Sequence, residues 1–227
     1  MTLVVGLIAK DGVVLASDSR MSSTITSNDT VEKIVNLDEH IAVGIAGDGT
    51  LGIHLLKLIK NDLDFKAGIV KLVEQIRKLL KDKFDEYYSN EPDPTKRESL
   101  TFLIVGYEKD NDRPEVYELK SRDNFIPRPS STGFNCIGIP YISEYLLNRF
   151  YEKEITVKQA EILAAFCVEE TESQSHEVGG DIKVASFSKT KSFSLKTPSD
   201  ISLIKEKCLT FHKGNKSKFY PESEPGE

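Results

Sequence analysis

The chain has 227 residues, enough for one large domain or two small ones, and we expect a single domain over residues 1–204 with a polar, partly disordered tail over 205–227. Its 30 Lys and Arg and 36 Asp and Glu give a formal net charge of −6 with both signs spread along the chain, which excludes the clustered positive charge of a nucleic-acid binder. The cysteines at 136, 167 and 208 lack CxxC spacing and no apolar run reaches the ~18 residues of a membrane span, so we expect a soluble, cytoplasmic protein with no disulfide framework, metal site, cofactor or membrane partner.

The opening of the sequence predicts a β-hairpin. Residues 3–9 (LVVGLIA) and 13–16 (VVLA) are rich in β-branched residues, and the Lys-Asp-Gly between them has turn chemistry. Neither run alternates apolar and polar residues, so both faces of these strands are expected to be covered. Residues 33–45 repeat the pattern, with a turn at 38–40.

After this second hairpin the apolar residues recur at helical spacing from residue 51 to residue 80, which predicts two consecutive amphipathic helices. The later predicted elements are strands at 100–107 and 115–119, helices at 141–151 and 157–171 with Thr156 as the N-cap of the latter, and a strand at 182–187. This order favours an α+β fold in which two antiparallel sheets pack face to face between helical layers, a four-layer αββα sandwich.

The segment from Thr2 to Arg20 resembles the mature N-terminus of proteasome β subunits and of the bacterial HslUV peptidase. In that family a catalytic Thr opens the first strand, a Gly lies four residues on, a DG turn follows, and a D-x-R triplet closes the second strand. All four features occur here at matching offsets, ending in the triplet Asp18-Ser19-Arg20. Further on, Lys33 resembles the family's catalytic lysine and Gly47 its oxyanion-hole glycine. The resemblance extends to about Ser188 and includes a late glycine-rich turn at 178–182.

The resemblance implies an N-terminal-nucleophile hydrolase, a threonine peptidase or amidase that forms an acyl-enzyme on Thr2 after Met1 is removed. A threonine hydroxyl is a poor nucleophile, but a free α-amine with a pKa of about 7.7 to 8.0 can take its proton. The ammonium of Lys33 would favour loss of the hydroxyl proton and keep the amine unprotonated. Asp18 would be the counter-charge of Lys33, and the N–H of Gly47 would point at the developing oxyanion.

Each of these residues also has a plain interpretation. Thr2 could be only a strand former, Asp18 and Arg20 an ordinary ion pair, and Lys33 a solvated lysine. Gly47 could be only part of a turn before a helix. The joint spacing at the family's offsets favours the functional interpretation.

Two features depart from the pattern of proteasome β subunits. Those subunits carry an Asp and a Ser where this chain has Ser175 and Val178, and the HslUV-type peptidase lacks that pair as well. The family's Gly-Ser-Gly turn would fall at residues 138–140, which contain no hydroxyl, so Ser130, Ser131 or Thr132 is a candidate substitute. The four histidines are too far apart for a metal motif.

The resemblance also implies substrate, partners and assembly. A pocket for the side chain before the scissile bond would be lined by Met21, Val31, Val35, Ile45 and Gly49, which favours cleavage after large apolar residues. The substrate would be a peptide or unfolded protein, the assembly a homo-oligomeric ring, and the partner an ATPase unfoldase. Two alternatives remain open, namely a catalytically silent scaffold like the proteasome's α-type subunits and a transferase or ligase in which another amine captures the Thr2 ester.

Overall fold

The N-terminal hairpin forms the centre of the first sheet. The computed structural model describes residues 2–22, 27–108, 113–188 and 190–219. Strands β1 (Leu3–Ala9) and β2 (Gly12–Ser17) pair antiparallel, and nearly all their residues are buried, as expected for strands covered on both faces. The sheet is completed by β10 (Phe134–Gly138) beside β1, and by β11 (Lys183–Ser188) and β12 (Lys191–Leu195) beyond β2.

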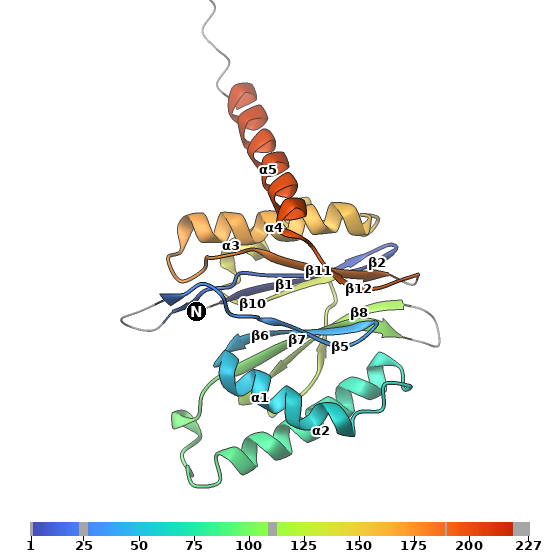
Figure 1. Ribbon diagram of the computed structural model, residues 1–227, viewed down its shortest axis with the longest axis vertical. Helices are drawn as coiled ribbons and strands as arrows, with labels where there is room; N and C mark the ends of the chain where they lie inside the picture. The colour runs from blue at the N-terminus through green and yellow to red at the C-terminus, as the bar shows by residue number, and fades with distance from the viewer. Residues whose placement is uncertain (1, 23–26, 109–112, 189, 220–227) are drawn as a thin grey trace, which may run out of the picture.

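The second sheet stacks on the first and is also antiparallel throughout (Figure 1). It contains, in spatial order, β5 (Ile34–Asp38), β6 (Ile41–Gly47), β7 (Leu100–Glu108), β8 (Arg113–Lys120) and β9 (Arg128–Pro129). The short strands β3 (Met21–Ser22) and β4 (Ser27–Asn28) pair with each other in the connection that leads from the first sheet to the second.

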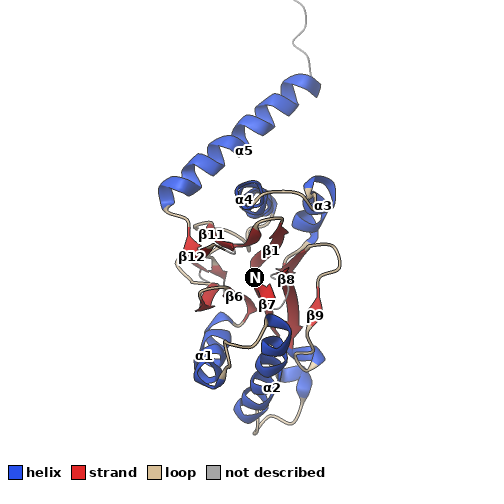
Figure 2. Cartoon of the chain, turned by 90° about the vertical axis from the view of Figure 1, so that its right-hand side faces the viewer, coloured by secondary structure: helices blue, strands red, loops and turns tan. Residues whose placement is uncertain are grey.

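Helices cover the outer face of each sheet (Figures 1 and 2). The helices α1 (Gly49–Ile59) and α2 (Ile69–Tyr87) lie on the second sheet, while α3 (Tyr141–Phe150) and α4 (Val157–Gln174) lie on the first. Short 3-10 turns occur at η1 (Lys60–Asp62), η2 (Pro94–Lys96) and η3 (Ser121–Asp123). Three apolar cores separate the layers, one under each helical layer and one between the sheets. The four-layer αββα prediction is confirmed.

Among the described helices and strands of five or more residues, the sequence patterns missed three. Strands β10 (FNCIG) and β12 (KSFSL) mix polar and apolar residues and form the two edges of the first sheet. The third is α5 (Pro198–Phe219), which runs across the expected boundary between domain and polar tail at residue 205. Its residues Ile201, Ile204 and Cys208 are buried at i, i+3, i+7 spacing, which docks this part of α5 onto α4.

Beyond that contact α5 projects away from the sandwich (Figures 1 and 2). The expected frayed tail at 221–227 lies outside the described residues. Within the described part of the chain, every helix is too short or too polar to cross a membrane.

Candidate active site

Asp18 is the hub of the candidate site. It directly follows β2, is 1% exposed, and accepts three hydrogen bonds. Its Oδ1 accepts from the N–H of Leu3 at 3.0 Å and from the Nζ of Lys33 at 2.7 Å. Its Oδ2 accepts from the N–H of Gly179 at 3.2 Å. One buried carboxylate therefore joins the start of β1, the residue before β5 and the turn after α4.

Lys33 is held as firmly as its partner. It is 3% exposed, and its Nζ donates to the main-chain oxygen of Arg20 at 2.5 Å as well as to Asp18. Burial lowers the pKa of Lys33 below its usual range, while the charge and hydrogen bond of Asp18 oppose that shift. A buried charge needs a counter-charge and further hydrogen bonds, and Lys33 has both, so the Asp18–Lys33 pair supports a fixed ammonium at this point.

Thr2 lies beside this pair and is 7% exposed. The peptide N–H that follows it, on Leu3, is the one bound to Asp18 Oδ1, and its own carbonyl accepts from the N–H of Ile139 at 2.9 Å. Gly138 has φ +92°, and a Cβ there would lie 1.8 Å from the Thr2 oxygen. Gly138 is therefore needed for the close approach of β10 to residue 2.

Gly47 is the last residue of β6 and lies at the same end of the second sheet as Lys33, which precedes the antiparallel strand β5. The N–H of Ile45 donates to the carbonyl of Lys33 at 2.9 Å, and the alternation of an antiparallel strand turns the N–H of Gly47 in the same direction. Gly47 has φ +101°, and a Cβ would lie 1.9 Å from the oxygen of Ser99. Only glycine fits this strand end without displacing the neighbouring chain.

The structure brings together only some of the five predicted pocket residues. Val35 and Ile45 pack in the core beneath α1 and α2, and Ile45 is 1% exposed. Gly49 is the first residue of α1, and a Cβ added there would lie in open space. The main-chain N–H of Val31 donates to the carbonyl of Ser19. Met21 is placed in β3, and its side chain lies outside the described part of the structure. Their role as a pocket remains a prediction.

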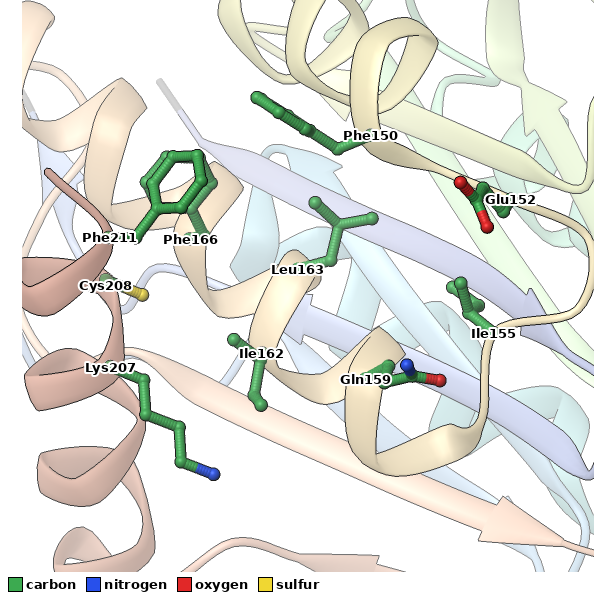
Figure 3. Close-up of a pocket in the computed structure, with 10 residues that line it drawn as sticks. All are labelled: Phe150, Glu152, Ile155, Gln159, Ile162, Leu163, Phe166, Lys207, Cys208 and Phe211. Carbon is green, nitrogen blue, oxygen red and sulfur yellow. The ribbon is translucent and has the colours of Figure 1, made fainter. Parts of the chain in front are cut away.

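Two cavities lie away from the candidate site. Figure 3 shows a groove of about 400 Å³ between α4 and α5, with apolar walls from Phe150, Ile162 and Phe211 and with Lys207 at its edge. A second cavity of about 620 Å³ lies between α2, η2 and η3. Neither contains a residue of the candidate site.

Several contacts at the site were not predicted from sequence. The plain interpretation paired Arg20 with Asp18, but Arg20 binds Asp29 instead, with Nε to Oδ1 at 2.9 Å. Ser19, which is fully buried, donates to the Asp29 carbonyl at 2.5 Å and accepts from the N–H of Asp181 at 2.7 Å. The only sequence signals for this cluster were the resemblances of the triplet Asp18-Ser19-Arg20 and of the glycine-rich turn at 178–182 to the family's pattern.

The two departures from the family pattern are also located. The hydroxyl of Ser175 accepts a hydrogen bond from the N–H of Glu177 within the same turn. Val178 is a fully buried core residue. The hydroxyls of Ser130 and Thr132 bind the carbonyl of Phe134. They lie beside the far end of β1, where Ile8 bonds Gly133, so the expectation that Ser130, Ser131 or Thr132 could act at Thr2 is wrong.

Cys136, on β10, is a poor alternative nucleophile. Burial raises the pKa of the Cys136 thiol well above its usual value, which keeps it protonated and unreactive. Among the described residues, no group of three or more His, Cys, Asp or Glu side chains is arranged to hold a metal ion.

Comparison with known proteins identifies the family. Residues 2–186 match the family model "Proteasome subunit". Proteasome subunit beta 2 of Pyrococcus furiosus is 40% identical over 70 residues, which cover 30% of this chain and about a third (34%) of that protein. Proteasome subunit alpha type-4 of Dictyostelium discoideum is 24% identical over 197 residues, which cover 82% of this chain and 74% of that one.

Solved structures agree on the fold. Anbu, described as an ancestral beta-subunit, from Yersinia bercovieri superposes with a TM-score of 0.78 at 16% identity, over 99% of this chain and all (100%) of that one. At that identity the likeness shows the αββα architecture alone. Since the family model spans most of the sequence, including the hairpin and the buried Asp18–Lys33 pair, this chain belongs to the proteasome subunit family.

Proposed function

We propose that the protein is an N-terminal threonine peptidase or amidase whose nucleophile is Thr2, exposed by removal of Met1. The observation that carries this proposal is the single oxygen, Asp18 Oδ1, that binds both the N–H following Thr2 and the ammonium of Lys33. A carboxylate so placed holds the ammonium of Lys33 at the start of β1, which Thr2 directly precedes. Met1 itself lies outside the described residues.

The proposed reaction begins when Thr2 Oγ1 attacks the carbonyl carbon of the substrate and passes its proton to the free α-amine. Lys33 stabilises the developing alkoxide and disfavours protonation of the amine by like-charge repulsion. The N–H of Gly47 donates to the oxyanion of the tetrahedral intermediate. The intermediate expels the amine of the substrate, which takes the proton, and leaves an ester on Thr2. Water then attacks this ester with the α-amine as base, which releases the acid and restores Thr2.

Two measurements test the nucleophile. Intact-mass analysis of the purified protein is expected to show loss of Met1. A peptide carrying an electrophilic carbonyl-reactive group is expected to label the parent and not Thr2→Ala, because that change removes one hydroxyl while leaving fold and assembly intact. Equal labelling of the two proteins would show that Thr2 is not the nucleophile.

We further propose that Met21, Val31, Val35, Ile45 and Gly49 line the pocket for the residue before the scissile bond. Burial of a Leu or Phe side chain in such a pocket contributes about 1.5 to 3 kcal/mol, whereas a charged side chain would lose its hydration. Cleavage after Leu, Tyr or Phe is expected, and Ile45→Gly should shift the preference toward the aromatic residues. Fluorogenic peptides that differ only at this residue measure it, and faster cleavage after Arg or Glu than after Leu would refute the assignment.

A second candidate function is that of a catalytically silent subunit. It is supported by the α-type relative from Dictyostelium, which covers 82% of this chain; a β-type relative from Streptomyces griseus covers 79%, so coverage does not separate the two functions. The labelling experiment separates the two functions, because a silent subunit would react with no probe even after loss of Met1.

The proposed assembly is a homo-oligomeric ring, with a peptide or unfolded protein as substrate and an ATPase unfoldase as partner. Light scattering at micromolar concentration is expected to give a mass several times that of one chain. A monomer would refute the ring.

A further inference from the structure

Arg20 joins two loops at the edge of the candidate site. Its Nε and Nη2 donate to the two carboxylate oxygens of Asp29 at 2.9 and 3.2 Å. Its Nη1 donates to the main-chain oxygens of His176 at 3.1 Å and Val178 at 3.4 Å. A planar guanidinium can make these contacts at once, whereas a lysine ammonium cannot reproduce the fork.

The loop held by Arg20 is the one that supplies the third hydrogen bond to Asp18. Gly179 donates its N–H to Asp18 Oδ2, and its carbonyl accepts from the N–H groups of Ser19 and Arg20 at 3.1 and 2.9 Å. A Cβ on Gly179 would lie 2.5 Å from the guanidinium carbon, so the side chain of Arg20 packs directly on this glycine. A shift of Arg20 would therefore move the turn and with it the carboxylate of Asp18.

Charge links the same residues to Lys33. Among the described residues, the charged groups that act on Lys33 are Asp18 and Arg20 in the loop after β2, and Asp29 after β4. The two carboxylates raise the pKa of Lys33, and the guanidinium lowers it. Arg20 and Asp29 therefore act on Lys33 in opposite directions, although they stabilise the same turn.

We propose that Arg20 and Asp29 form a positioning pair for the candidate active site, in which the guanidinium locks the 176–180 turn onto Asp18 and Asp29 both holds the guanidinium and offsets its charge at Lys33. This inference rests on the proposed role of Lys33 as the ammonium beside Thr2. In the described part of the chain, the hydrogen bonds of the Arg20 and Asp29 side chains go to each other and to the 176–178 turn, and not to Thr2.

The test uses three variants of the full chain, Asp29→Asn, Arg20→Gln and Arg20→Lys. Asp181→Asn is the matched control, because Asp181 is an exposed carboxylate beside the same turn that pairs with Lys183. One measurement is the pH profile of kcat/KM for a fluorogenic peptide. The other is the pKa of Lys33 Nζ, followed by NMR of protein with isotope-labelled lysine and assigned by the signal that Lys33→Met lacks.

Opposite shifts are expected from the two charge removals. Asp29→Asn should lower the pKa of Lys33 and the alkaline limb of the profile by about 0.5 pH unit, and Arg20→Gln should raise both by a similar amount. Both variants should lose about 10- to 100-fold in kcat, because the turn is no longer locked. Arg20→Lys should keep the Lys33 pKa of the parent and still lose kcat, and Asp181→Asn should match the parent in both measurements.

If Arg20 and Asp29 had a purely structural role, their variants would lose activity without opposite shifts in the pKa of Lys33. Shifts in the same direction, or Lys33 titrations that match the control, would overturn the inference. If the parent hydrolyses no peptide, the proposed function fails, and the NMR titration alone decides whether Arg20 and Asp29 act on Lys33.

Discussion

Two pairs of a buried acid and a lysine have nearly the same N–O distance and different surroundings. Lys33 lies 2.7 Å from Asp18, with side-chain exposures of 4% and 0%, and Lys196 lies 2.8 Å from Glu161, with exposures of 20% and 7%. Asp18 also accepts two main-chain N–H groups, whereas Glu161 accepts the side chain of Ser186 at 2.6 Å. The first pair therefore orders the backbone of three segments around Thr2, while the second joins side chains on α4, β11 and the residue after β12. Both carboxylates are buried, so burial of the acid alone does not mark a functional pair; what distinguishes Asp18 is the main-chain N–H groups that it binds.

The largest expected difference is in catalysis. Lys33→Ala should reduce kcat/KM for a fluorogenic peptide by at least about 10³-fold, since it removes the charge that tunes both the hydroxyl and the amine of Thr2. Lys196→Ala should leave kcat/KM within about 2-fold of the parent, because its pair has no link to the proposed reaction. Near-normal turnover by Lys33→Ala would end the distinction between the two pairs.

The same two variants should also differ in stability. Lys33→Ala leaves the Asp18 carboxylate buried without its counter-charge, which is expected to cost about 3 to 5 kcal/mol. Lys196→Ala should cost about 1 kcal/mol, since the lysine is partly exposed and water can reach the vacated space. Urea unfolding followed by circular dichroism measures both values. Equal losses would mean that the extra hydrogen bonds of Asp18 do not separate the pairs energetically.

The pH dependence of stability sharpens the comparison further. Burial lowers the pKa of Lys33, so between that value and the ordinary value near 10.5 the unfolded chain holds a proton that the folded chain lacks. The free energy of unfolding of the parent, relative to Lys33→Ala, should therefore rise with pH through this window. Activity should fall over the same window as the ammonium is lost. Unfolding midpoints from pH 8 upward measure the difference, and a decline with pH would show that the pKa of Lys33 is raised instead.

The smallest expected effects come from two buried serines, one beside each pair. Ser186→Ala removes the hydrogen bond to Glu161 and should destabilise the protein by about 1 kcal/mol. Ser17 precedes Asp18 and is fully buried, and its hydroxyl has no hydrogen-bond partner among the described residues. Ser17→Ala should accordingly be neutral or stabilising by up to about 1 kcal/mol. Thermal unfolding of the two variants tests the contrast, and a larger loss for Ser17→Ala would reveal a role for its hydroxyl.

Local sequence patterns were sufficient for most of the architecture. The apolar β-branched runs predicted β1, β2, β5 and β6 with their turns, and the helical spacing predicted α1 to α4. Thr156 caps α4 in a capping box with Gln159, as its position before an apolar helical run indicated. The pattern was less clear for β10, β12 and α5, because polar residues interrupt their apolar positions.

For the site, the sequence by itself determined which residue types stand at the family's offsets, and hence named Thr2, Asp18, Lys33 and Gly47. Only the tertiary structure decided which groups bind each other. It paired Arg20 with Asp29 rather than Asp18, placed Ser130 and Thr132 at the wrong end of β1, and brought Gly179 to Asp18 across 161 residues. The physical reason is that spacing along the chain sets helices, strands and turns, whereas a hydrogen bond of about 3 Å depends on how distant segments pack.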